Sequence, residues 1–126
     1  MTEFIVHVTD RPGVLAMITG QLAAAGVHIE ALAAFGWGDD AQVRLLPDDA
    51  AATRRVLQED GLAYDEREVL VTHLPHRADA LAALARQLAD GGVNIEALYV
   101  LRSTTEGLEL AIAVDELDAA RTITGP

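Results

Sequence analysis

The chain contains no cysteine, few aromatic residues and few basic ones. Without cysteine it has no disulfide framework and no thiolate metal site. Nine lysine and arginine residues stand against twenty aspartate and glutamate residues, which gives a formal net charge of −11 over 126 residues. A chain so acidic has no basic patch to neutralise nucleic-acid phosphates, and an anionic membrane repels it. We therefore expect neither a nucleic acid nor a membrane as its partner.

Long apolar runs are also missing. No run approaches the roughly 20 residues that span a bilayer, and the N-terminus lacks the basic and then apolar segments of a signal peptide. A cytoplasmic protein is the expectation. Hydrophobic residues nevertheless make up 51% of the chain, which is ample for a core and argues against disorder. The length allows one ordinary domain or two very small ones.

The most informative stretch is residues 9–32. Asp10, Arg11, Pro12 and Gly13 are turn-forming residues that directly precede an amphipathic run, in which one helical face carries Val14, Leu15, Ile18 and Leu22. Pro12 suits a first helical turn, and Gly13 allows a ligand close to the backbone. Gly26 then ends the helix. The pattern predicts a helix N-terminus at the end of a strand, where free N–H groups favour a carboxylate.

This stretch occurs twice in the chain. At an offset of 66 residues, Gly26–Leu32 and Gly92–Leu98 agree at six of seven positions without a gap. Gln21-Leu22-Ala23 lies on Gln87-Leu88-Ala89 at the same offset. Self-similarity at a fixed spacing indicates two copies of one structural unit.

The patterns predict the same order of elements in both copies. In the first copy we expect strands at 3–8, 27–36, 41–46 and 62–66, with helices at 14–25 and 49–60. In the second we expect strands at 69–74, 93–102 and 108–114, a helix that ends at Gly91-Gly92, and a last helix capped by Asp115 with Asp118.

This order predicts an α+β protein of two tandem ferredoxin-like βαββαβ units, spanning 1–67 and 68–126. Each unit is expected to form an antiparallel sheet in the strand order 4-1-3-2 with its helices on one face. The second unit is expected to lack its last strand.

The sheet edges predict association. Strand two is an edge strand in both units and has apolar residues on both faces, so we expect the two copies of strand two to pair. Leu32, Leu98 and Val100 are expected on the sheet face away from the helices. The strand at 69–74 has no neighbour on its outer side. Because bare edges and apolar patches are usually covered, we expect a homo-oligomer, most simply a homodimer.

Asp-Arg-Pro-Gly-Val-Leu after a first strand, and Gly-Val-Asn-Ile-Glu-Ala-Leu opening a second, resemble the ACT domain. The resemblance covers nearly the whole chain as two tandem copies. It implies a regulatory module that binds an amino acid or a similar metabolite between the first turn of one unit and strand two of its neighbour. Carried onto this sequence, the site comprises Asp10, Arg11, Pro12, Gly13, Val14 and Leu15, with Asn94 and Ile95 opposite.

The second copy departs from this pattern. Its turn has His76 in place of Asp10, Ala78 in place of Pro12 and Asp79 in place of Gly13. Asp79 adds a side chain and a negative charge where an anion would lie. The resemblance therefore implies a weaker second site, which consists of His76, Arg77, Ala80, His28 and Ile29.

Simpler interpretations stay open for the same residues. Asp10 to Gly13 is also an ordinary turn before a helix. Asn94 is also an ordinary polar residue on an edge strand. His7 and His73 suit the open face of a sheet better than a metal site, and we expect no metal and no cofactor.

Three functions are considered. The first is a free-standing amino-acid sensor without catalysis. The second is a subunit that regulates a biosynthetic enzyme in trans, since Asn-Ile-Glu-Ala-Leu also resembles the small subunits of acetolactate synthase. The third, an enzyme of ferredoxin-like fold, is least favoured because no paired acid and base is evident.

Overall fold

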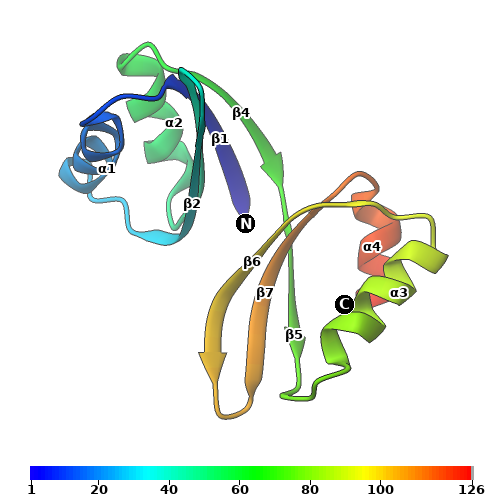
Figure 1. Cartoon of the computed structure of the whole chain (residues 1–126). Coiled ribbons are helices and arrows are strands. Elements are labelled where there is room, and N and C mark those ends of the chain that lie inside the picture. Colours follow the sequence, from blue (N-terminus) through cyan, green and yellow to red (C-terminus); the bar gives the residue numbers. More distant parts are fainter. Residues whose placement is uncertain (126) are drawn as a thin grey trace. The chain divides into compact units, whose positions relative to one another are not determined.

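The computed structural model describes residues 1–125, and the chain divides into two compact units, Met1–Arg67 and Glu68–Pro126. Each unit is an antiparallel sheet covered by two helices on one face (Figure 1). This is the α+β architecture of ferredoxin-like repeats that the sequence predicts. Within residues 1–125, no helix is long and apolar enough to cross a membrane.

The first unit contains four strands and two helices. They are β1 (Thr2–Thr9), α1 (Val14–Ala24), β2 (Ile29–Trp37), β3 (Asp40–Pro47), α2 (Ala50–Glu59) and β4 (Ala63–Glu68). The sheet order is β2-β3-β1-β4, as predicted. Its core lies between the sheet and the helices and includes Phe4, Val6, Ile18, Leu22, Leu45 and Leu57.

The second unit repeats this plan with one strand fewer. Its elements are β5 (Leu70–Leu74), α3 (Ala80–Asp90), β6 (Ile95–Thr104), β7 (Gly107–Val114) and α4 (Leu117–Thr124). The order β5-β7-β6 leaves β5 at an edge within the described part of this unit. The core again lies under the helices and includes Leu84, Leu88, Leu110 and Ile112.

Both first helices end in the same glycine motif, which delays the following strand. Gly26 has φ +78°, and the Val27 N–H group donates to the Leu22 carbonyl at 3.0 Å. In the second unit Gly92 has φ +76°, and the Val93 N–H group donates to the Leu88 carbonyl at 2.9 Å. These are the bonds of a Schellman cap. Val27 and Val93 are therefore buried parts of the cap, and the strands begin two residues later than predicted.

A bulge reverses the predicted faces of strand two. In β2 the register shifts between Ile29 and Ala31, so that Leu32 lies opposite the core residue Leu45. In β6 a matching shift places Leu98 opposite Ile112. Directly opposed residues point to one face. The prediction that Leu32 and Leu98 lie away from the helices is therefore wrong: both lie on the helix-covered side, at the exposed edge.

The predicted face of Val100 is wrong for the same reason. It lies opposite Leu110, a core residue, yet its side chain is 55% exposed because β6 lies at the edge of the sheet. A bulge inserts one extra residue, and one residue is enough to exchange the two faces of everything beyond it. The sequence pattern alone does not show where that residue is inserted.

The predicted cap at Asp115 is also wrong. The Asp115 side chain accepts a hydrogen bond from the Asn94 N–H group at 2.8 Å, and the N-cap of α4 is Glu116, whose side chain makes no capping bond. In the first unit Asp48 plays the same part by accepting from the His28 N–H group at 2.9 Å. These carboxylates fasten the start of strand two to the end of strand three.

One charged cluster is buried on the sheet face away from the helices. The Glu3 side chain is fully buried on β1, where the Arg67 Nε donates to its Oε1 at 2.5 Å and the Arg44 Nη1 lies 3.5 Å from its Oε2. A buried carboxylate is tolerable only with such partners. Glu3 therefore ties β1 to its neighbours on both sides, β3 and β4.

We expect Glu3→Gln to lower the free energy of unfolding by roughly 3–5 kcal/mol, because it leaves two guanidinium groups without their buried counter-charge. Urea unfolding measures the change. Arg86→Gln is the control, since Arg86 lies on the surface 3.8 Å from Asp90 and its loss is expected to cost within about 0.5 kcal/mol. Equal small effects of both substitutions would contradict the assigned role of Glu3.

Candidate ligand site in the first unit

The turn between β1 and α1 is built around Gly13. This residue is the N-cap of α1 and has φ +89°, a left-handed conformation that glycine adopts without strain. No atom lies within 4 Å of the position that a Cβ would take there. Gly13 therefore leaves open space in front of the first turn of α1, where the N–H groups of Leu15 and Ala16 have no partner inside the helix.

Asp10 is held beside this turn by the backbone of the neighbouring hairpin. Its N–H group donates to the Asp39 carbonyl at 2.8 Å. Its carboxylate lies against Gly36 of β2 so closely that a Cβ on Gly36 would stand 2.4 Å from the Asp10 Oδ2 atom. The Asp10 carboxylate can therefore take this position only because residue 36 is a glycine. Asp10 itself remains exposed to solvent.

These elements surround a hollow of about 440 Å³. Its volume falls within the range of roughly 300–1,000 Å³ that is usual for small-molecule sites. The wall from the first turn and α1 is formed by Asp10, Arg11, Val14 and Leu15, and β2 and β3 supply Ala34, Phe35, Gly36, Ala41, Gln42 and Val43. Four of the predicted site residues therefore line one hollow within the first unit. Pro12 and Gly13 shape the turn beside it.

The hollow brings opposite charges to one place. The first turn of α1 presents N–H groups and the positive end of the helix dipole, which favour a carboxylate. The Asp10 carboxylate favours a cation, and a charge-assisted bond of this kind is about twice as strong as a neutral one. Val14 and Leu15 add apolar surface to the same hollow. A small zwitterion with an apolar side chain matches this set of groups.

The corresponding turn in the second unit takes a different path. Asp79 stands where the first unit has Gly13, and its φ of −93° is an ordinary right-handed value. Its Oδ1 accepts from the Arg77 Nε at 3.2 Å. The Ala80 N–H group donates to the Arg77 carbonyl at 3.2 Å, as the Val14 N–H group donates to the Arg11 carbonyl at 3.4 Å in the first unit. The His76 Nε2 bonds to the Thr104 carbonyl. The His76 and Asp79 side chains are thus already bonded, while Arg77 and Ala80 line a hollow of about 230 Å³.

The predicted site residues before and at the start of strand two are held by their backbones. The Asn94 N–H group donates to Asp115, and the Asn94 carbonyl accepts from the Asp115 N–H group at 3.2 Å. Its side chain stays exposed. Ile95 is half-buried and packs against the core of its unit. His28 and Ile29 are the equivalent residues of the first unit and are held in the same way.

The sequence reasoning missed the floor of the hollow. Ala34, Gly36 and Ala41 are small residues from the β2–β3 hairpin, and the closeness of Gly36 to Asp10 is the contact that places the carboxylate. The one available signal was a glycine inside a predicted strand, which often marks a close approach. Nothing in the pattern says which residue approaches it.

The histidines have carboxylate neighbours on the sheets. The His7 Nε2 lies 2.9 Å from Asp65 on β4, and the His73 Nε2 lies 3.0 Å from Glu109 on β7. Within residues 1–125, no three His, Cys, Asp or Glu side chains are grouped so that they hold a metal ion.

Comparison with known proteins gives matches among solved structures alone. No model of a protein family matches the chain. No curated protein matches it either. A crystal structure of a protein from Bacteroides thetaiotaomicron is similar with a TM-score of 0.87 and 20% identity, over 97% of this chain and 84% of that one.

Regulatory subunits of aspartate kinase are also similar. The subunit from Thermus thermophilus, in a ligand-free form, has a TM-score of 0.69 and 18% identity over 98% of this chain and 88% of that one. The subunit from Thermus flavus has a TM-score of 0.60 and 19% identity over the same shares. At these identities the likeness shows the fold, and the predicted α+β fold of two ferredoxin-like units is confirmed.

The left-handed Gly13 gives a direct test of the turn. We expect Gly13→Ala to destabilise the chain by about 1–2 kcal/mol, because an L-residue is strained at positive φ. Gly20→Ala, at an exposed position inside α1, is the matched control and is expected to stabilise by roughly 1 kcal/mol. Thermal unfolding of both variants measures the difference. Stabilisation by both alanines would show that the turn is not fixed as described.

Proposed function

We propose that the chain is a regulatory protein without catalysis of its own, and that it binds an amino acid at the turn between β1 and α1. The observation that carries the proposal is the hollow beside Gly13, where the open N-terminus of α1 and the Asp10 carboxylate lie on one wall. The helix end suits the ligand's α-carboxylate, and Asp10 suits its α-ammonium.

The likeness to regulatory subunits of aspartate kinase supports the regulatory part of the proposal. The site is proposed to be completed by the exposed Asn94 side chain immediately before β6, which offers both a donor and an acceptor. The backbone bonds between Asn94 and Asp115 fix the point from which this side chain extends.

The second turn is proposed to bind such a ligand poorly. The His76 ring is already bonded to the Thr104 carbonyl, and it offers no anion for an ammonium group. Asp79 adds negative charge beside the first turn of α3. We infer one good site per chain, at Asp10, and a second that is weaker by roughly ten- to hundredfold, since a charge-assisted bond contributes about 1.5–3 kcal/mol.

A regulated enzyme is the second candidate partner. Exposed apolar side chains recur in both units, namely Leu15 on α1 and Leu32 on β2 in one, and Leu81 on α3 with Leu98 and Val100 on β6 in the other. They are related by the 66-residue offset, apart from Val100, whose counterpart is Ala34. A surface of this kind suits an enzyme held in trans or a second copy of the chain. The pairing of β2 with β6 stays a prediction.

The binding prediction compares the two turns directly. A thermal-shift screen of the twenty standard amino acids identifies the ligand, and calorimetry then measures its affinity. We expect Asp10→Ala to weaken binding at least tenfold and His76→Ala to leave it nearly unchanged. Two equivalent sites per chain, or binding that survives Asp10→Ala, would contradict the proposal. If no amino acid stabilises the chain and an enzyme co-purifies with it, regulation of that enzyme in trans would be favoured.

Self-association has its own test. We expect sedimentation to show a homodimer at micromolar concentration, and Val100→Asp to shift it towards monomer by placing a charge in the apolar edge. Ala51→Asp adds the same charge at an exposed position on α2 and is the control. A wild-type chain that sediments as a monomer would contradict the prediction.

A further inference from the structure

The helix α4 occupies in the second unit the place that α2 occupies in the first. After the turn between strands two and three, equivalent residues of the two units lie 67 positions apart instead of 66. The bounds of β3 (Asp40–Pro47) and β7 (Gly107–Val114) show this offset. The backbone bonds agree: the Thr53 N–H group donates to the Asp49 carbonyl, and the Ala120 N–H group donates to the Glu116 carbonyl. Arg121 is therefore the structural counterpart of Arg54.

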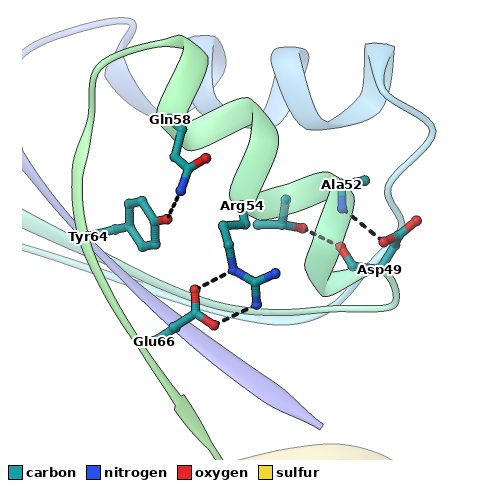
Figure 2. Close-up of polar contacts among 7 residues, drawn as sticks. Asp49, Ala52, Arg54, Gln58, Tyr64 and Glu66 are labelled. Atoms are coloured by element: carbon teal, nitrogen blue, oxygen red, sulfur yellow. Dashed lines mark hydrogen bonds and ion pairs between the residues drawn. The ribbon is translucent and has the colours of Figure 1, made fainter.

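In the first unit Arg54 binds the fourth strand. Its Nε and Nη2 atoms donate to the two carboxylate oxygens of Glu66 on β4, at 2.8 and 2.6 Å (Figure 2). Two residues earlier on the same strand, the Tyr64 hydroxyl accepts from the Gln58 Nε2 at 3.1 Å, and its ring lies 5.9 Å from that of Phe4. Hydrogen bonding to Arg54 lowers the pKa of Glu66, so the pair is charged at neutral pH.

In the second unit the corresponding position beside β5 is open. The sheet order ends at β5 among the described residues. Along its outer side lie two hollows of about 420 and 230 Å³; the first is lined by β5 and Arg121, the second by β5, Leu84 and Ile123 among others. The Arg121 Nη1 lies 3.8 Å from the exposed Asp118 carboxylate, which is a much looser contact than that of Arg54.

The two edge strands, β4 and β5, differ in the number of charged side chains, which proteins use to protect an exposed edge. Four of the six residues of β4 are charged, Asp65 to Glu68, and charge discourages further pairing. The five residues of β5 are Leu-Val-Thr-His-Leu, with no lysine, proline or carboxylate. The chemistry of β5 is that of a strand with a partner on its outer side. A five-residue edge alone is too short to hold two copies together, because stable interfaces bury about 1,200–2,000 Å².

We propose that the outer edge of β5 binds an extended acidic segment of a partner protein as a fourth strand. The segment pairs with the β5 backbone, as in other complexes formed by strand addition. A carboxylate on it bonds the Arg121 guanidinium, as Glu66 bonds Arg54. An apolar or aromatic side chain two residues earlier points to the same face and fills the hollow beside Leu84 and Ile123.

The test uses the chain's own fourth strand as the probe. A fluorescein-labelled peptide with the sequence of residues 61–68 is titrated with the full chain, and its anisotropy gives the affinity. We expect saturable binding that Arg121→Gln weakens at least tenfold. Arg86→Gln removes a more exposed charge from α3 and is expected to have no effect. The net charge of −11 opposes an acidic peptide at long range, so dependence on Arg121 reports a local bond.

Peptide variants keep the test independent of the folding of any protein variant. Glu66→Gln in the peptide is expected to weaken binding at least tenfold, whereas Asp65→Asn, with the same net charge, is expected to leave it nearly unchanged. Equal effects of the two peptide substitutions, or no binding at all, would overturn the proposal. So would a homodimer that Arg121→Gln dissociates without any peptide binding, since a second copy would then occupy the edge.

Discussion

The backbone pairing of the first and third strands of each unit, β1 with β3 and β5 with β7, is the interaction on which the rest of the unit depends. Its register places Phe4 opposite Leu45 in one unit and Leu70 opposite Ile112 in the other, so that one face of each sheet becomes the floor of the core. The helices cover that face. The chain leaves the ends of β1 and β5 at fixed points, and the turns that follow determine what the two helix N-termini present to solvent. The candidate site is therefore a consequence of where β1 stops.

Most of the fold follows from local patterns in the sequence. The repeat, the glycine that ends α1 and the alternation in β1 were enough for the element order, the strand order and the absence of a fourth strand from the described part of the second unit. The late start of strand two has a local cause, the glycine cap of the preceding helix. The other two failures each depend on a contact between distant residues. The bulge at Ile29 is set by pairing with β3, and Asp115 is drawn from the cap of α4 to the Asn94 N–H group. No pattern along one segment encodes such choices.

The candidate site was predictable to a similar extent. Asp10, Arg11, Val14 and Leu15 follow from turn chemistry and helical periodicity, and all four line the hollow in the first unit. The contact between the Asp10 carboxylate and Gly36 joins two elements that are far apart in sequence, so it emerges only from the structure. The difference between the two turns was expected from the charge of Asp79. The structure adds a conformational reason, because Gly13 has φ +89° and Asp79 has φ −93°. The two units thus share one scaffold and differ in the first turn.

The central claim is that a small zwitterion binds at one turn of the chain and not equally at the other. Backbone amide chemical shifts test this most directly, because they report each turn separately in the intact chain. During titration with the amino acid that stabilises the protein, the account predicts saturable shifts at the amides of Gly13, Val14, Leu15 and Ala16, with little change at Ala80 and Leu81. Shifts of similar size and midpoint in both turns, or shifts confined to other surfaces, would contradict it.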